Sequence, residues 1–71
     1  MDRIVREVLS AAERGDQVAL KALLHPYLHW TEPRIDLRGR VKVLARLAAS
    51  PSPKPPASYE LRDGQIYRWV S

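Results

Sequence analysis

The chain contains no cysteine and only three glycines. Without cysteine, a protein can form neither disulfides nor a zinc site built on thiolates. Three glycines are too few for a glycine-rich loop that cradles phosphate. The sequence also shows no paired acids of the glycosidase kind and no Ser-His-Asp arrangement. These absences exclude disulfide-stapled domains, P-loop nucleotide-binding proteins, glycosidases and serine hydrolases.

Long apolar segments are missing as well. No run approaches the ~20 apolar residues that a helix needs to span a bilayer. The N-terminal stretch MDRIVREVL mixes acidic and basic side chains with apolar ones, which is unlike a signal peptide. We therefore expect a soluble, cytoplasmic protein with no membrane association.

The chain is short and basic. With 71 residues it forms one domain at most, which we place at 1–71. A domain of this size buries only about 60% of the surface of its unfolded chain, so self-association is the simplest remaining support. The net charge is +4, and nine of the twelve basic residues are arginines, which suits nucleic-acid binding. Arginine together with alanine also reflects genome base composition, so nucleic-acid binding is kept as an alternative.

Two amphipathic helices are expected at the N-terminal end. Apolar residues recur with helical spacing over 3–14, and Asp2 suits the N-cap of this helix. Asp16 restarts the pattern as a second N-cap. Pro26 disfavours helix at the residue before it, so the second helix ends near Leu24. The apolar face of the second helix is expected to contain Val18, Ala19, Ala22 and Leu23, with Leu20 adjoining.

The middle of the chain carries strand signals. The aromatic stretch YLHWT at 27–31 predicts a strand with Leu28 and Trp30 on one face. The segment IDL at 35–37 predicts a short strand that pairs back on it.

A helix and a connector follow. Residues 40–49 predict a third helix, on which Lys42 and Arg46 face solvent together. Four of the six prolines fall in 50–58. Since proline lacks the amide donor, this segment predicts an extended connector rather than a helix or a central strand.

Residues 58–70 predict a β-hairpin around Asp63-Gly64, because a type I′ turn needs positive φ at both central residues. A two-residue loop places Leu61 opposite Ile66 on the inner face. Regular alternation then puts Glu60, Arg62, Gln65, Tyr67 and Trp69 on the outer face. A bulge at Gly64 would shift this pairing and mix the faces. We prefer the regular form because it brings Leu61 and Ile66 together.

These elements indicate an α+β domain in which three helices pack on a small antiparallel sheet. The predicted core contains Ile4, Val8, Leu9, Leu20, Leu23, Leu28, Trp30, Val43, Leu44, Leu47, Leu61 and Ile66.

Three segments follow one another in a recognisable order: ALKALLHPYLHWTEP, LRGRVKVLARL and ELRDGQIYRW. The first is a helix that runs through His-Pro into a strand with a tryptophan. In the second, a Gly-basic pair opens a helix, and the third is the hairpin. Their order and spacing over most of residues 8–70 resemble the nuclear transport factor 2-like superfamily, in its SnoaL-like branch.

The resemblance implies a curved antiparallel sheet wrapped around helices into a cone, whose mouth often holds a small molecule. Members commonly dimerise through the outer sheet face, and their activities include polyketide cyclisation, steroid isomerisation and epoxide hydrolysis. In this chain the connector at 50–58 replaces further long strands. The resemblance therefore implies a shortened member with a truncated, shallow cone, and none of the family's catalytic residues is carried over.

Three residues are candidates for acid-base catalysis. His29 has an imidazole, which titrates near neutrality, and Glu32 is a carboxylate that Tyr67 could complement as a proton donor. Alternatively, His29 is a half-exposed strand residue and Glu32 belongs to a salt-bridged loop. The residues expected at a ligand site are Trp30, His29 and Tyr59. A metal would need His25, His29 and Glu32 together, and we expect neither a metal nor a cofactor.

Tyr67 and Trp69 are expected to form an exposed aromatic patch on the outer sheet face. Such a patch usually marks an interface, and a twofold partner could cover it with the same patch. We therefore expect a homodimer through these two residues. Base stacking on them, with Arg62 and Arg68 nearby, is the nucleic-acid alternative.

The function we expect is that of a SnoaL-like module that dimerises and binds a small apolar ligand without catalysis. One alternative is a small isomerase or cyclase with an acid-base residue in a shallow pocket. The other is a basic nucleic-acid-binding protein. An enzyme would require a water-excluded cavity with a carboxylate or an imidazole inside it.

Overall fold

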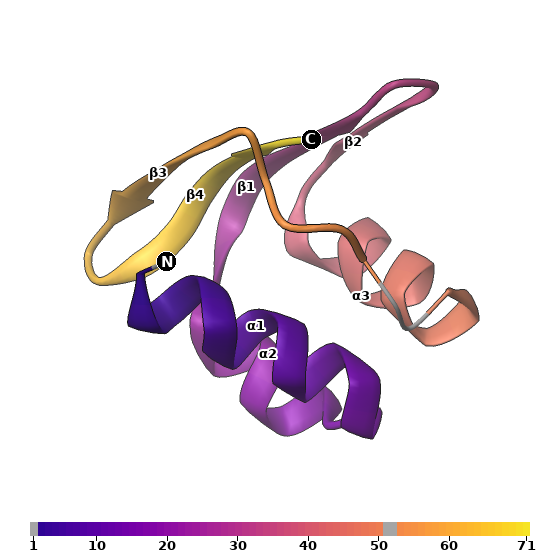
Figure 1. The fold of residues 1–71 in the computed structure, drawn as a ribbon, viewed down its shortest axis with the longest axis vertical. Helices are drawn as coiled ribbons and strands as arrows, with labels where there is room; N and C mark the ends of the chain where they lie inside the picture. The colour runs from indigo at the N-terminus through magenta and orange to yellow at the C-terminus, as the bar shows by residue number, and fades with distance from the viewer. Residues whose placement is uncertain (1, 51–52) are drawn as a thin grey trace.

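The computed structural model describes residues 2–50 and 53–71, which form three helices and one four-stranded sheet (Figure 1). The elements are α1 (Arg3–Arg14), α2 (Gln17–Leu23), β1 (Leu24–Glu32), β2 (Ile35–Arg38), α3 (Arg40–Ala49), β3 (Ser58–Arg62) and β4 (Gln65–Val70). The predicted α+β class is confirmed, as are the three helices and both hairpins. The predicted connector is neither helix nor strand over 53–57, and residues 51 and 52 of it lie outside the described part of the chain.

Short-range capping determines where the first two helices begin and end. Gly15 ends α1 with a φ of 68°, in the left-handed region that glycine tolerates. Asp16 caps α2, since its carboxylate accepts a hydrogen bond from the amide of Ala19 at 3.0 Å. Asp2 makes no such side-chain cap, contrary to prediction. Its carboxylate accepts a hydrogen bond from the hydroxyl of Tyr59 at 2.7 Å, which links the start of α1 to β3.

The strands are ordered β2-β1-β4-β3. β1 pairs with β2 and β3 pairs with β4 in antiparallel fashion, whereas the two central strands β1 and β4 are parallel. The sheet is therefore mixed, and the prediction of a purely antiparallel sheet is wrong. Between β1 and β4 the chain passes through β2, α3, the connector and β3, and so long a connection lets β4 enter the sheet in the same direction as β1.

The hairpin turn has the predicted form. Asp63 and Gly64 have φ values of 54° and 76°, both positive as a type I′ turn requires. Arg62 pairs with Gln65 beside the turn, and Leu61 pairs with Ile66 next to them, again as predicted.

Beyond that pair, a β-bulge shifts the register of the hairpin. The next pair is Glu60 with Arg68, so Tyr67 is an extra residue on β4 with no partner on β3. Because of this extra residue, Ile66 and Trp69 both face the core, three positions apart. The regular alternation that we predicted is wrong, and it misplaced Trp69 on the outer face.

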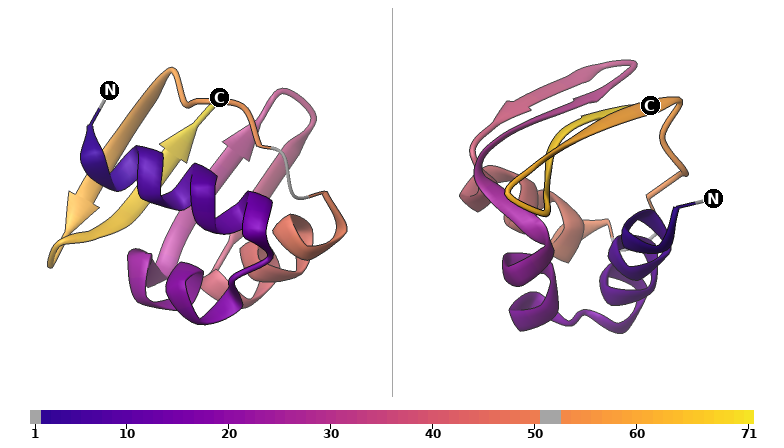
Figure 2. Two further views of the ribbon diagram at one scale, coloured as in Figure 1. Left: turned by 60° about the horizontal axis from the view of Figure 1, so that its bottom comes forward. Right: turned by 90° about the vertical axis from the view of Figure 1, so that its left-hand side faces the viewer.

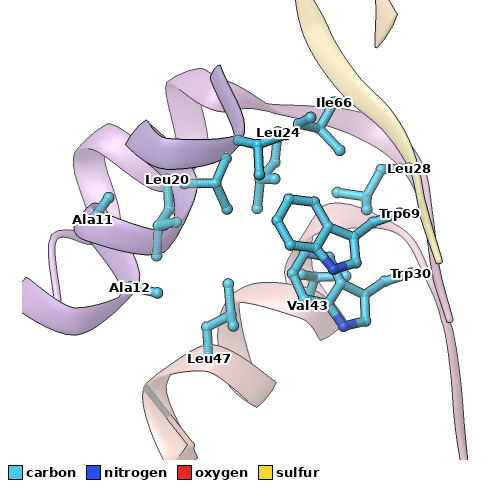
Figure 3. Packing of buried hydrophobic residues seen from close by; sticks show 12 residues of the cluster. Ala11, Ala12, Leu20, Leu24, Leu28, Trp30, Val43, Leu47, Ile66 and Trp69 are labelled. Atoms are coloured by element: carbon cyan, nitrogen blue, oxygen red, sulfur yellow. The ribbon is translucent and has the colours of Figure 1, made fainter. Parts of the chain in front are cut away.

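The core is built around two stacked indole rings. Trp30 and Trp69 are neighbours in the register of β1 and β4, and their rings lie parallel with centroids 4.6 Å apart (Figure 3). This separation matches the spacing of adjacent strands in a sheet. The buried apolar residues are Val5, Val8, Ala11, Ala12, Leu20, Leu24, Leu28, Trp30, Val43, Leu47, Ile66 and Trp69.

Two predicted inward residues are exposed instead. Leu61 has 46% of its surface accessible, because it lies on the edge strand β3, where only Tyr59 is even partly buried. Val18 is 82% exposed, since α2 turns Leu20 rather than Val18 towards the core. The predicted core residues that are only partly buried are Ile4, Leu9, Leu23 and Leu44.

The helices lie on the inner side of the curved sheet (Figure 2). Side chains from α1, α2, α3, β1 and β4 meet there to form the core. The outer face of the sheet carries no helix in the part of the chain that the structure describes. Tyr27 projects from that face and is 79% exposed.

Candidate functional site

The three predicted acid-base residues do not converge on one site. His29 and Tyr67 both line a depression on the outer face of the sheet. Glu32 lies at the end of β1 and bonds instead to Trp30 and Arg46. The carboxylate is therefore separate from the imidazole and the phenol that were to act with it.

The space between the helices and the sheet is filled by apolar side chains. Among residues 2–50 and 53–71, no polar or charged residue is buried. The water-excluded cavity that the enzyme alternative requires is not formed by these residues. A concave site has to lie at the margin of the core rather than inside it.

Such a site lies where the C-terminal half of α3, the β1–β2 turn and the connector meet. It is a recess of about 280 Å³. We call it the Glu32 recess, and its lining is Glu32, Pro33, Arg46, Leu47, Ser50, Pro53, Lys54, Pro55 and Ser71. Leucine and proline side chains make most of the wall apolar, and a few polar groups converge within it, which is the usual composition of a small-molecule site.

Glu32 connects the recess to the core. Its carboxylate accepts a hydrogen bond from the indole nitrogen of Trp30 at 2.8 Å and others from the guanidinium of Arg46 at 3.4 and 3.5 Å. Burial disfavours the charged form, but these hydrogen bonds outweigh it and hold the pKa of the Glu32 carboxyl below its ordinary value. Glu32 is therefore an ionised anchor and not a proton acceptor poised near neutrality.

The charged side chains of the recess differ in whether they are paired. Glu32 and Arg46 neutralise each other, and their side chains are only 24% and 35% exposed. Lys54 forms no ion pair with any residue that the structure describes. The recess thus holds the unpaired ammonium group of Lys54 beside apolar walls.

The buried indole of Trp69 has no hydrogen-bond partner for its nitrogen among the described residues. Figure 3 shows the nitrogens of Trp30 and Trp69 on the same side of the stacked pair. Since the Trp30 nitrogen bonds to Glu32, this side of the core is the one next to the recess. An unsatisfied buried donor is uncommon in folded proteins.

The predicted ligand-site residues are dispersed. Trp30 is fully buried and reaches the recess only through Glu32. His29 faces the opposite side of the sheet. Tyr59 is half-buried and donates to Asp2, which raises the pKa of its hydroxyl and lowers the pKa of the Asp2 carboxyl. These three residues do not line a common pocket.

The two histidines are likewise held apart. Nε2 of His25 is 3.9 Å from the carboxylate of Asp63, and His29 bonds to the carboxylate of Asp36. No group of three or more potential metal ligands occurs within the described ranges. The predicted alternative of a metal on His25, His29 and Glu32 therefore has no support in the arrangement of these residues.

A wide groove of about 570 Å³ lies between α1 and α2. Two of its arginines are already engaged: Arg3 pairs with Glu7 at 3.1 Å, and Arg14 pairs with Asp16 at 3.4 Å. Internal ion pairs thus account for much of the charge on its rim.

Sequence reasoning missed the two basic residues of the recess. Arg46 was assigned to the solvent face beside Lys42, whereas it reaches Glu32 across fourteen residues. The spacing of Glu32 and Arg46 along the chain carries no signal for this pair. The proline-rich composition predicts an extended connector that includes Lys54. It carries no signal that this connector packs beside α3.

Comparison with family models, curated proteins and solved structures finds no match for this chain. The resemblance to the nuclear transport factor 2-like superfamily therefore remains a prediction. Over the ranges 2–50 and 53–71, no helix has the length and apolar character needed to cross a membrane.

Proposed function

We propose that this protein is a noncatalytic module that binds a small organic anion with an apolar body in the Glu32 recess. The observation that carries the proposal is the combination of apolar walls with the ammonium group of Lys54, which is in no ion pair with the described residues. The predicted homodimer and cytoplasmic location are kept as parts of the same proposal.

The geometry favours one orientation of the ligand. Pro33 and the prolines of the connector offer an apolar surface for the body of the ligand, while Lys54 and Arg46 offer donors to its carboxylate. Arg46 already shares its charge with Glu32, so Lys54 has to supply most of the attraction. A neutral ligand of the same shape would lack this contact and bind more weakly.

Tryptophan fluorescence can report on binding. Trp30 and Trp69 are the two tryptophans of the chain, and the indole of Trp30 bonds to a carboxylate in the recess wall. Titration with benzoate or hexanoate is expected to change the emission in a saturable way. The variant Lys54→Glu should weaken binding roughly tenfold or more, because a charge-assisted contact becomes repulsive.

The matched control is Lys42→Glu. Lys42 is exposed on α3 and does not line the recess. Its replacement by glutamate changes the net charge of the protein by the same amount as Lys54→Glu does. It should leave the affinity unchanged. If both variants lose affinity equally, the attraction is a property of the whole surface, and the proposed site is wrong. The absence of any saturable change in wild-type emission would also overturn it.

A further inference from the structure

Three side chains form a row straight across the outer face of the sheet. His29 on β1 pairs in register with Arg38 on β2 and also with Arg68 on β4. Neighbouring strands lie ~4.8 Å apart, so the backbones of Arg38 and Arg68 lie about 10 Å apart with His29 between them. We call these three residues the arginine row. The register of the sheet, and not the order of the residues along the chain, brings these side chains together.

Folding alone does not account for the arginine row. Arg38 and Arg68 lie on the two strands that flank β1, so their like charges repel each other across one intervening strand. Within the described residues neither Arg38 nor Arg68 takes part in an ion pair or a side-chain hydrogen bond, although Glu60 lies opposite Arg68 in the register. Neither guanidinium is therefore neutralised by an ion pair within the described residues, and the nearby carboxylate of Asp36 is engaged with His29.

The arginine row lines a depression together with two tyrosines. The depression has a volume of about 230 Å³ and is lined by Tyr27, His29, Arg38, Tyr67 and Arg68.

Two of these side chains contact neighbouring residues that orient them, and a third is open to solvent. The imidazole of His29 is oriented by the carboxylate of Asp36. The ring of Tyr67 lies perpendicular to the ring of His25, with centroids 5.1 Å apart, and the guanidinium carbon of Arg62 lies 4.3 Å from the centroid of the Tyr67 ring. Tyr27 is 79% exposed, so its ring is open to a ligand.

From this arrangement we infer that the arginine row binds the phosphate group of a small phosphate or phosphomonoester. Guanidiniums bind phosphate oxygens through paired hydrogen bonds, and two arginines that line one depression suit a dianion. A nucleic-acid strand instead presents single negative charges spaced along its backbone. Two arginines that line one small depression match one dianionic group better than such a series of charges. The exposed ring of Tyr27 adds a stacking surface for an aromatic group attached to the phosphate.

The test uses isothermal titration calorimetry at low salt, with inorganic phosphate and phenyl phosphate as the two probes. Wild-type protein is expected to bind at least one of them saturably. Arg38→Gln and Arg68→Gln should each weaken binding roughly tenfold or more, since each removes a charge-assisted contact. Arg34→Gln is the matched control, because it removes an exposed arginine in the β1–β2 turn that does not line the depression. Unchanged tryptophan emission shows that each variant is folded.

The two probes distinguish the source of the phosphate group. Tighter binding of phenyl phosphate indicates an aromatic monoester, and tighter binding of inorganic phosphate indicates the free anion. The inference is wrong if neither probe binds at millimolar concentration, or if Arg34→Gln weakens binding as much as the other two variants. It is also wrong if a thymidine oligomer binds more tightly than both probes and all three substitutions weaken it equally, which would indicate a diffuse nucleic-acid surface.

Discussion

At the scale of single residues, Trp69 and Tyr67 show how little chemical type says about position. Both are amphipathic aromatics on one short strand, two residues apart. Regular alternation would place them on the same face. One extra residue in the register sends Trp69 into the core and leaves Tyr67 outside. A charged substitution at Trp69 would therefore disrupt the core and could not serve as a test of an interface.

Glu32 provides a prediction about the pH dependence of stability. Despite its partial burial, bonding to Trp30 and Arg46 keeps the pKa of its carboxyl below the ordinary 4.5. A group with a lowered pKa in the folded state stabilises the fold above its unfolded pKa and loses that effect as the pH falls through its folded pKa. Glu32→Gln should therefore lower the free energy of unfolding by about 1 kcal/mol near pH 7, and the difference from wild type should shrink below about pH 4.5.

Urea denaturation, followed by tryptophan emission at about pH 7 and about pH 3, measures this difference. Glu13→Gln, which alters an exposed carboxylate of α1, controls for the removal of one acidic charge. A Glu32→Gln protein that is destabilised by the same amount at both pH values would contradict the assigned role of Glu32.

At the scale of elements, the sequence predicts those features that depend only on residues close together in the chain. Asp16 caps the start of α2, and Asp63-Gly64 forms the turn of the hairpin. Each depends only on residues within one helical turn or one hairpin, so the sequence predicts both. The parallel pairing of β1 with β4 joins Trp30 to Trp69, which are far apart in the chain. No short-range pattern encodes that pairing, so the strand order, the buried Trp69 and the exposed Leu61 could not be predicted.

The bulge supplies a prediction about deletion. With Tyr67 removed, the observed pairs become a regular ladder: Leu61–Ile66, Glu60–Arg68, Tyr59–Trp69 and Ser58–Val70. The variant should therefore fold with Trp69 still buried. It should lose only about 1 kcal/mol, from the contact between the rings of Tyr67 and His25. Cooperative urea unfolding with a wild-type emission maximum in the folded state would confirm this result.

Deletion of His29 is the matched control on the neighbouring strand. β1 is in regular register with both of its neighbours from His29 to Thr31. Removing one residue there moves Trp30 to the other face, so this variant should be unfolded or molten. Equal behaviour of the two deletions would show that the bulge is not an extra residue of the kind described.

At the scale of the whole molecule, the recess and the arginine row both arise from assembly. Arg46 and Lys54 line one recess with Glu32 only after the connector has packed beside α3. Arg38 and Arg68 lie on one face only after their strands have paired with β1. Sequence reasoning identified His29, Glu32 and Tyr67 as polar or aromatic residues of interest. It could not assign them to two separate sites, because that division depends on which side of the sheet each one faces.

The predicted homodimer is tested at this scale. Tyr27 and Tyr67 lie on the outer face that no described helix covers, and a twofold partner would bury both. Light scattering is expected to show twice the chain mass of 8.1 kDa. Tyr67→Glu should shift the mass towards that of the single chain.

Val18→Glu provides the control for this experiment, because Val18 is an exposed apolar residue on α2. Since the arginine row occupies the same face, saturating phosphate should also favour the single chain. A wild-type mass of 8.1 kDa without phosphate would show that the predicted homodimer is wrong.

The position of β4 has a consequence for synthesis. β4 lies between β1 and β3 but follows both of them in the chain. A ribosome that adds about 5–20 residues per second completes both neighbours before the strand that joins them. For seconds the nascent polypeptide carries Trp30 without the ring of Trp69 stacked on it. The apolar surface around Trp30 stays accessible to chaperones and proteases until β4 has been synthesised.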